Sequence, residues 1–189
     1  MSSLVLWAAL LLSGAVYFPV ASATEQIPDF IEIDGESRPL FAEPFNQVLE
    51  APERWQAFVR DYAPGQCSAN WRGYQAYWSI RDAKLYLQRL LREACQCREE
   101  MPLDVFFPGQ DAPVLADWYS GTLLIPLGQP GRGRHMGYST EYERYWIVEV
   151  QNGQIVSRNL ITHEELLRNR EPMREQRSTQ PHGGGSESP

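Results

Sequence analysis

The stretch YQAYWSIRDAKLYL, residues 74–87, decides the fold. Every second position of its first half carries a side chain suited to one buried face of a β-strand: Tyr74, Ala76, Trp78 and Ile80. Residues 81–84 then predict a tight turn, after which Leu85-Tyr86-Leu87 returns as the second strand of an antiparallel hairpin. Residues 88–97 fit either a continued strand or a helical stripe, and both alternatives stay open.

Further hairpins are predicted on both sides of this stretch. Asp34-Gly35 separates two short strands, residues 30–33 and 36–40, and tolerates the positive φ angles that a tight turn needs. Asn152-Gly153, the strongest short hairpin signal in the chain, lies between residues 145–150 and Ile155-Val156. One more strand is expected from Trp118 to Pro126, after a Pro108-Gly109 turn.

Two short helices complete the expected elements. Residues 52–62 place Trp55, Phe58, Val59 and Tyr62 on one face, which we expect to pack against the sheet. Thr162 and Glu165 form a capping box for a helix over residues 163–170. The fold class predicted is α+β and mostly β: a single domain built on an antiparallel sheet of hairpins, which can curl toward a barrel.

The amino-terminal residues predict export. Residues 4–20 carry no charge, and Ala21-Ser22-Ala23 matches the small-residue pattern that signal peptidase requires. We therefore assign residues 1–23 to a cleaved signal peptide, residues 24–170 to one globular domain and residues 171–189 to a disordered tail poor in apolar residues. Export to the periplasm or beyond follows, and an uncleaved membrane anchor is the alternative.

The three cysteines are interpreted in that exported context. Cys67, Cys95 and Cys97 are an odd set, so one disulfide and one remaining thiol are expected. The pairing predicted is Cys67 with Cys97, or else with Cys95. Three thiolates are one ligand short of a tetrahedral metal site, so no metal is expected here.

Charge and composition limit the function classes. The 189-residue chain has 17 basic and 24 acidic residues, a net charge of −7, which disfavours binding to a nucleic-acid backbone. The sequence contains neither a phosphate-loop Gly-Lys-Ser/Thr step nor a His-Glu-x-x-His metal motif. No cofactor is therefore predicted.

A glycine-rich loop and the aromatic residues are the candidate binding features. Residues 128–138 combine flexible backbone with a local positive pair, so we expect this loop to be exposed and to attract an anionic partner. Exposed tyrosine and tryptophan rings on the strands favour binding as well. The candidate binding residues are Arg132, Arg134, His135, Tyr138, Trp118 and Trp78.

Catalysis has weaker support. His135 precedes Glu141 and Glu143, and a histidine with a carboxylate partner can perform acid–base chemistry if the fold brings the groups together. No nucleophile motif of the Gly-x-Ser-x-Gly type accompanies them. An enzyme of hydrolase type is therefore the lesser hypothesis.

The chain resembles a family of small uncharacterised bacterial proteins over residues 71–156. The resemblance is carried by the order of several blocks: Trp71-Arg72-Gly73-Tyr74 with Trp78-Ser79-Ile80, Lys84-Leu85-Tyr86-Leu87, Ala116-Asp117-Trp118-Tyr119-Ser120-Gly121 with Ile125-Pro126, and Met136-Gly137-Tyr138 with Tyr142-Glu143. It implies one domain and no particular reaction. Together, these observations predict a non-catalytic binding or interaction module of the cell envelope, with a structural or accessory envelope protein as the alternative.

Overall fold

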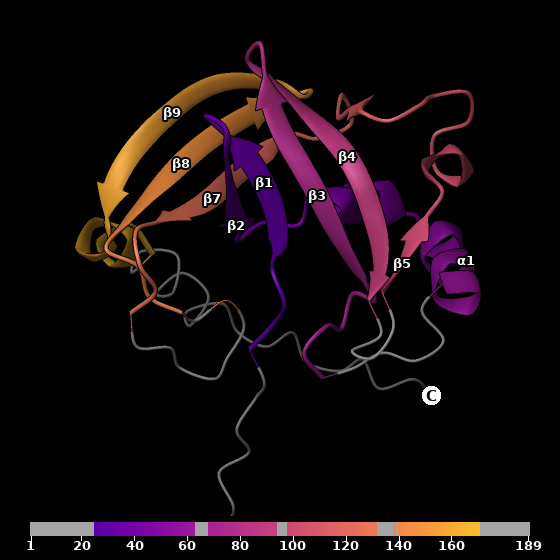
Figure 1. Ribbon diagram of the computed structural model, residues 1–189, viewed down its shortest axis with the longest axis horizontal. Coiled ribbons are helices and arrows are strands. Elements are labelled where there is room, and N and C mark those ends of the chain that lie inside the picture. Colours follow the sequence, from indigo (N-terminus) through magenta and orange to yellow (C-terminus); the bar gives the residue numbers. More distant parts are fainter. Residues whose placement is uncertain (1–24, 63–67, 94–97, 132–137, 139, 171–189) are drawn as a thin grey trace, which may run out of the picture.

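One curled sheet of nine strands dominates the computed structural model, which describes residues 25–62, 68–93, 98–131, 138 and 140–170 (Figure 1). The main path of the sheet runs β2-β1-β3-β4-β9-β8-β7, and β5 and β6 both pair with β4. The strands are β1 Asp29–Ile33, β2 Glu36–Leu40, β3 Tyr74–Arg81, β4 Lys84–Glu93, β5 Arg98–Met101, β6 Val114–Leu115, β7 Gly121–Leu127, β8 Arg144–Gln151 and β9 Gln154–Thr162. The predicted class, α+β and mostly β, is confirmed.

The predicted hairpins are formed by the expected turns. Asp34 and Gly35 have φ angles of 54° and 78° between β1 and β2, and Asn152 and Gly153 have 47° and 73° between β8 and β9. In the central hairpin Arg81 pairs with Lys84, and the ladder of β3 and β4 continues to Tyr74 and Arg92. Residues 88–93, for which a strand and a helix both fitted the sequence, therefore belong to strand β4, because β3 and β5 pair with its two edges. Residues 94–97 lie outside the described part of the chain.

One pair of neighbouring strands departs from the antiparallel arrangement. β1 runs parallel to β3, with Ile31 opposite Trp78. A parallel pair needs a long connection. Residues 41–73 provide it, and within them lie a 3₁₀ helix, η1 (Pro44–Leu49), and helix α1 (Pro52–Tyr62). The sheet is therefore mixed.

The sheet curls but does not close into a barrel. β4 and β9 share only the pair Lys84 and Gln154, because β6 and β5 occupy the edge of β4 beyond that point. At the opposite margin the backbone N–H of Phe41, directly after β2, donates to the carbonyl of Leu124 in β7 at 2.8 Å. The two ends of the sheet therefore approach each other without forming a continuous ladder.

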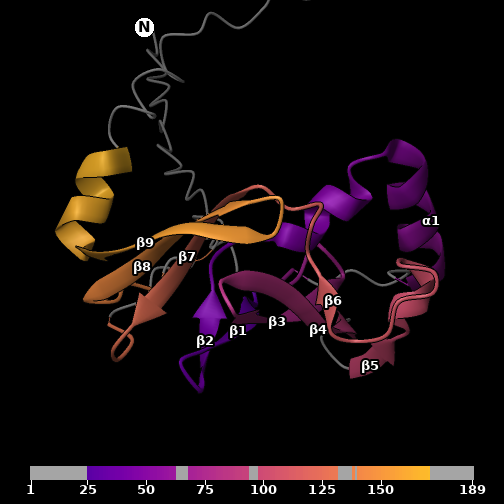
Figure 2. The same ribbon diagram turned by 90° about the horizontal axis from the view of Figure 1, so that it is seen from above.

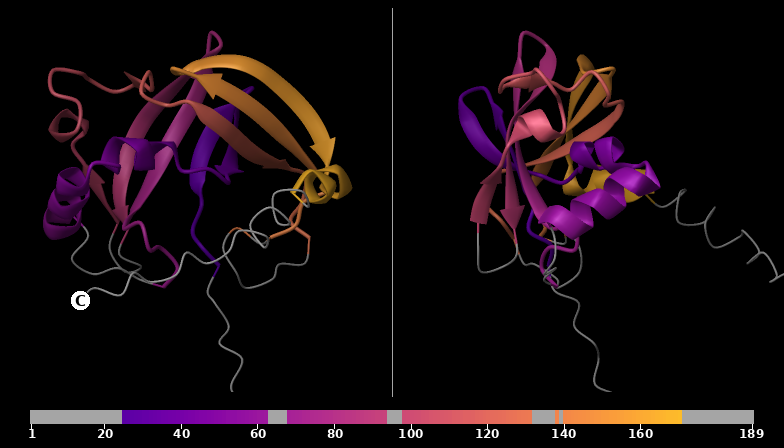
Figure 3. Two further views of the ribbon diagram at one scale, coloured as in Figure 1. Left: turned by 180° about the vertical axis from the view of Figure 1, so that it is seen from behind. Right: turned by 90° about the vertical axis from the view of Figure 1, so that its right-hand side faces the viewer.

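The helices lie at opposite ends of the molecule (Figure 2). η1 and α1 cover one face of β3 and β4 (Figure 3), where Phe45 and Phe58 pack against Tyr74. The helix over residues 163–170 follows β9 and buries Leu166 beside Ile161. Both predicted helices are confirmed, and a single 3₁₀ turn, η2 (Leu103–Val105), adds a short element. Among the described residues, no helix is long and apolar enough to cross a membrane.

The predicted strand from Trp118 begins three residues late, at Gly121. The N–H of Tyr119 donates to the carbonyl of Ala116 at 3.0 Å, which makes a turn. The carbonyl of Tyr119 in turn accepts from the N–H of Gly153 at 2.9 Å. Residues 118–120 therefore pack as a turn against the β8–β9 hairpin.

Candidate functional site

Several predicted site residues cannot be placed. Arg132, Arg134 and His135 lie outside the described residues, as do Cys67, Cys95 and Cys97. The anion-attracting loop, the disulfide and the His135 acid–base pair therefore stay predictions. The remaining candidates, Tyr138, Trp118 and Trp78, are described.

Trp78 is buried and Trp118 is half-buried, so both of these candidate binding residues also take part in packing. Trp78 is 1% exposed, and its indole N–H donates to Oδ2 of Asp29 at 3.1 Å. Trp118 stacks on Phe107 with ring centroids 4.5 Å apart, and its indole N–H donates to the carbonyl of Pro44 at 3.4 Å. Strand alternation places Trp78 toward the core from β3, whereas Trp118 packs from the turn that precedes β7.

Tyr138 leads to a polar network beneath one end of the sheet. Its ring stacks on Phe41 with centroids 5.1 Å apart, and its hydroxyl donates to Oε1 of Glu43 at 2.8 Å. The same Glu43 oxygen lies 3.6 Å from Nε of Arg72. The predicted loop residue is thus linked to a buried arginine that sequence reasoning did not select.

Arg72 forms a buried ion pair with Asp29. Its Nη1 donates to Oδ1 of Asp29 at 2.9 Å, and its Nη2 donates to the carbonyl of Ile27 at 2.6 Å. The two side chains are 8% and 0% exposed. Asp29 also accepts hydrogen bonds from the N–H of Ala76 and the indole of Trp78. The pair therefore ties the start of β1 to the loop before β3.

Burial and charge act in opposite directions on this ion pair. Burial raises the pKa of the Asp29 carboxyl above 3.8, and the charge of Arg72 and the other two donors oppose that rise. Burial, the largest single effect, would lower the pKa of Arg72, but the attraction of Asp29 together with Glu43 and the neighbouring tyrosines outweighs it and raises that pKa. Arg72 is therefore a permanent cation whose charge Asp29 balances.

Asn46 and Tyr74 extend the network toward the helices. Nδ2 of Asn46 donates to Oε2 of Glu43 at 2.5 Å, and Oδ1 of Asn46 accepts from the hydroxyl of Tyr74 at 2.6 Å. Burial raises the pKa of Tyr74 well above its ordinary value, so this phenol stays protonated and donates. We call this group the Arg72 network: Asp29, Glu43, Asn46, Arg72, Tyr74 and Tyr138.

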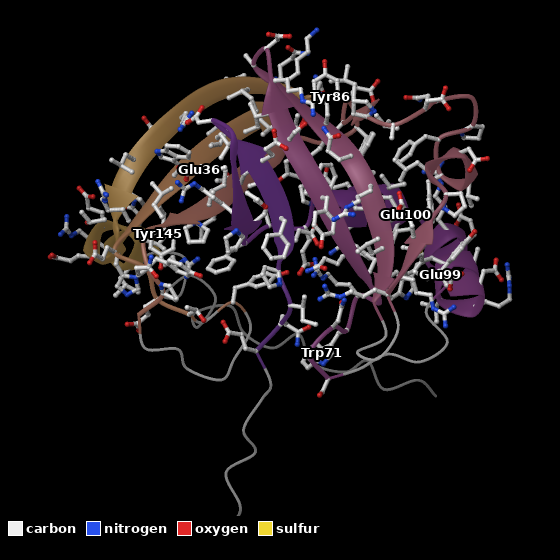
Figure 4. All side chains as sticks on the ribbon, in the orientation of Figure 1. Glu36, Trp71, Tyr86, Glu99, Glu100 and Tyr145 are labelled. Atoms are coloured by element: carbon white, nitrogen blue, oxygen red, sulfur yellow. The ribbon has the colours of Figure 1, made fainter. Side chains whose placement is uncertain are left out.

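A wide-mouthed pocket of about 390 Å³ opens beside the Arg72 network. We call it the tryptophan pocket, and its lining residues are Asn46, Leu49, Trp55, Trp71 and Arg72. Trp55 is 36% exposed and Trp71 is 64% exposed, so both indoles reach solvent. Figure 4 shows Trp71 at the end of the molecule where β3 begins.

The backbone around Trp71 is held firmly although its side chain is exposed. Its neighbours Asn70 and Arg72 are both buried. Nδ2 of Asn70 donates to the carbonyl of Tyr74 at 2.8 Å, and the N–H of Trp71 itself donates to Oε1 of Gln26 at 3.1 Å. The backbone of this loop therefore has little conformational entropy left to lose when a ligand contacts Trp71.

A second pocket contains the two glutamates of the acid–base hypothesis together with another histidine, His163. His163, Glu141 and Glu143 line a pocket of about 350 Å³ together with residues 129–131 and Tyr142. Nδ1 of His163 lies 3.3 Å from the hydroxyl of Tyr145. Within the described part of the chain, no ion pair joins His163 to either glutamate. The described contacts of the His163 side chain are with Tyr145.

Sequence reasoning did not identify the tryptophan pocket. Trp71 was one of many aromatic residues expected on the strands or at their edges, and Trp55 was assigned to the packed face of α1. The available signal in the sequence was that two polar residues, Asn70 and Arg72, flank Trp71. Both are buried while Trp71 is exposed, and the burial of Arg72 depends on a partner distant in the chain. No family model matches the chain, and comparisons with curated proteins and with solved structures found no match either.

Proposed function

We propose that this protein is an exported, non-catalytic binding module of the cell envelope, and that its ligand binds in the tryptophan pocket. The observation that carries the proposal is the exposure of Trp71 on an anchored loop beside a pocket. Tryptophan is the residue type most enriched at binding hot spots, and a pocket pre-organised around it lowers the entropic cost of binding.

The chemistry of the pocket supports binding rather than catalysis. Arg72 is the one charged residue among those that line it, and Asp29 and Glu43 already balance its charge. A general acid or base needs a titratable group within reach of a substrate and with a pKa near the working pH. Arg72 is unsuited to that role because its pKa is raised above the ordinary arginine value.

The exported location rests on the sequence. The uncharged run of residues 4–20 and the Ala21-Ser22-Ala23 site support a cleaved signal peptide, and the cysteines support a disulfide between Cys67 and Cys97 or Cys95. Both features belong to a protein of an oxidising compartment. Amino-terminal sequencing of protein recovered from the periplasm tests the first, with residue 24 expected at the new terminus.

The binding function is tested by NMR of the mature protein labelled with ¹⁵N. Each tryptophan indole N–H gives its own signal, so the spectrum reports on Trp55 and Trp71 separately from buried Trp78. Solubilised envelope glycans, lipids and peptides are added in turn. At least one fraction is expected to shift the signals of Trp55 and Trp71 while that of Trp78 stays in place. If every fraction leaves both signals unmoved, the proposal is wrong and an accessory role is favoured.

A further inference from the structure

The tryptophan pocket is lined by two indole rings that one ligand can contact. Trp55 comes from α1 and Trp71 from the loop before β3, and both line the same pocket with 36% and 64% of their surface exposed. The face of an indole ring carries partial negative charge and attracts polarised C–H bonds. The flat face of a pyranose ring is lined with such C–H bonds, so a sugar can stack there.

The charge balance of the pocket disfavours a charged ligand. Arg72 on the pocket wall repels a cation. Oε1 of Glu43 lies 3.6 Å from Nε of Arg72, but Glu43 is not among the residues that line the pocket. An anion would compete with Asp29 and Glu43, which already hold the guanidinium. A neutral ligand leaves no buried charge uncompensated.

The pocket retains capacity for polar contacts with a neutral ligand. Asn46 uses one N–H and one lone pair within the Arg72 network, which leaves one amide N–H and one lone pair. Nε of Arg72 is fully buried and lies 3.6 Å from Oε1 of Glu43, so the polar capacity that the pocket offers a ligand is that of Asn46. A hydroxyl group both donates and accepts, so a polyhydroxylated ligand can use donors and acceptors alike.

From these observations we infer that the ligand of the tryptophan pocket is a neutral oligosaccharide, stacked on Trp71 and Trp55 with a hydroxyl group bonded to Asn46. The inference rests on the proposed binding function and names its ligand class. The volume of about 390 Å³ lies at the lower end of the range for small-molecule sites, roughly 300–1,000 Å³. A short glycan segment rather than a long chain therefore fills it.

The inference is tested with defined probes on the mature protein. Maltotriose, cellotriose and N,N′,N″-triacetylchitotriose serve as neutral saccharides, choline as the cation and citrate as the anion. Indole signals of Trp55 and Trp71 are followed by NMR during each titration. At least one neutral trisaccharide is expected to shift both signals in a saturable way, and choline and citrate are expected to leave them unchanged.

Variants connect the binding to the pocket. Trp71→Ala is expected to lower the affinity for that trisaccharide by about tenfold, and Trp71→Phe to retain most of it because a ring face remains. Leu160→Ala removes an exposed apolar side chain from β9, outside the pocket, and is the control expected to bind normally. Trp71 is largely exposed, so its alanine variant is expected to fold with an unchanged far-ultraviolet dichroism spectrum.

The outcomes separate the two proposals. If choline, citrate or a peptide shifts Trp55 and Trp71 and no saccharide does, the ligand class is wrong and the binding function stands. If neither these probes nor the envelope fractions move either signal, both proposals fail. Equal binding by the parent and Trp71→Ala would place a saccharide site elsewhere on the surface and overturn the inference.

Discussion

Nη1 of Arg72 donates a hydrogen bond of 2.9 Å to Oδ1 of Asp29, and the pair joins the loop before β3 to the start of β1. The two residues are 43 positions apart in the chain and both are buried. Asp29 also holds the indole of Trp78 and the backbone of Ala76. This carboxylate therefore holds together the end of the sheet at which the tryptophan pocket lies.

Replacing Asp29 by asparagine is expected to destabilise the fold by about 3–5 kcal/mol, the usual cost of leaving one charge of a buried pair without its partner. The exposed fraction of Arg72 is only 8%, so water cannot replace the lost carboxylate fully. Urea unfolding followed by tryptophan fluorescence measures the change. Asp34→Asn is the matched control, because Asp34 pairs with Arg158 at the surface and its loss is expected to matter little. Equal destabilisation by both variants would contradict the importance of the buried pair.

Gly153→Ala is expected to destabilise the protein by more than about 2 kcal/mol, because two penalties act together. The residue has a φ of +73°, and an added Cβ would lie 2.8 Å from the carbonyl oxygen of Ala116. Gly35→Ala provides the comparison, since Gly35 has a φ of +78° with nothing within 4 Å of the added Cβ. It should cost only the backbone penalty, about 1–2 kcal/mol. Thermal unfolding of the two variants checks the order, and equal destabilisation by both would show that the contact with Ala116 relaxes freely.

Thr162→Ala is expected to lower the stability of the helix over residues 163–170 by about 1 kcal/mol, the usual effect of losing an N-cap. Oγ1 of Thr162 accepts from the N–H of Glu165 at 3.2 Å, and Oε2 of Glu165 accepts from the N–H of Thr162 at 2.7 Å. Hydrogen exchange of the helix amides is the measurement, because a terminal helix opens locally. Glu164→Gln lies outside the capping box and is the control expected to leave exchange nearly unchanged.

Protection of the same helix is expected to fall in acid. The backbone N–H of Thr162, followed by its hydroxyl, lowers the pKa of Glu165 below 4.5. A lowered carboxyl pKa contributes stability above its unfolded value, and that contribution is lost as pH falls through the lowered pKa. Exchange measured from pH 6 to about pH 3 should therefore show the loss below about pH 4.5. Glu165→Gln should remove this dependence, and an unchanged acid profile in that variant would assign the effect to other groups.

The cysteine pairing is checked by mass spectrometry of peptides from nonreduced protein. A peptide linking Cys67 to Cys97, or to Cys95, is expected if the protein folds in an oxidising compartment. The remaining cysteine should react with a thiol reagent. Three free thiols in protein recovered from the periplasm would contradict the prediction.

Local signals determined the turns and helix ends correctly. Asp34-Gly35, Asn152-Gly153 and the box of Thr162 with Glu165 each act over a few residues, so their conformations follow from neighbouring atoms alone. The period-two pattern of residues 74–80 likewise determined a strand, although Gln75 and Ser79 on its other face are buried as well. These features account for the mostly β class and for most of the element order.

Only the tertiary structure decided which tryptophans are available to a ligand. Trp71 and Trp78 stand seven residues apart in the sequence, yet Trp71 is 64% exposed and Trp78 is 1% exposed. Trp78 lies on β3 within the core, where Asp29 accepts its indole N–H, and Asp29 lies beside β3 because β1 pairs parallel to it. That pairing depends on the long connection through η1 and α1, which also brings Trp55 beside Trp71. Contacts between segments so far apart in the chain are selected by the packing of the whole core, and no short stretch of sequence records them.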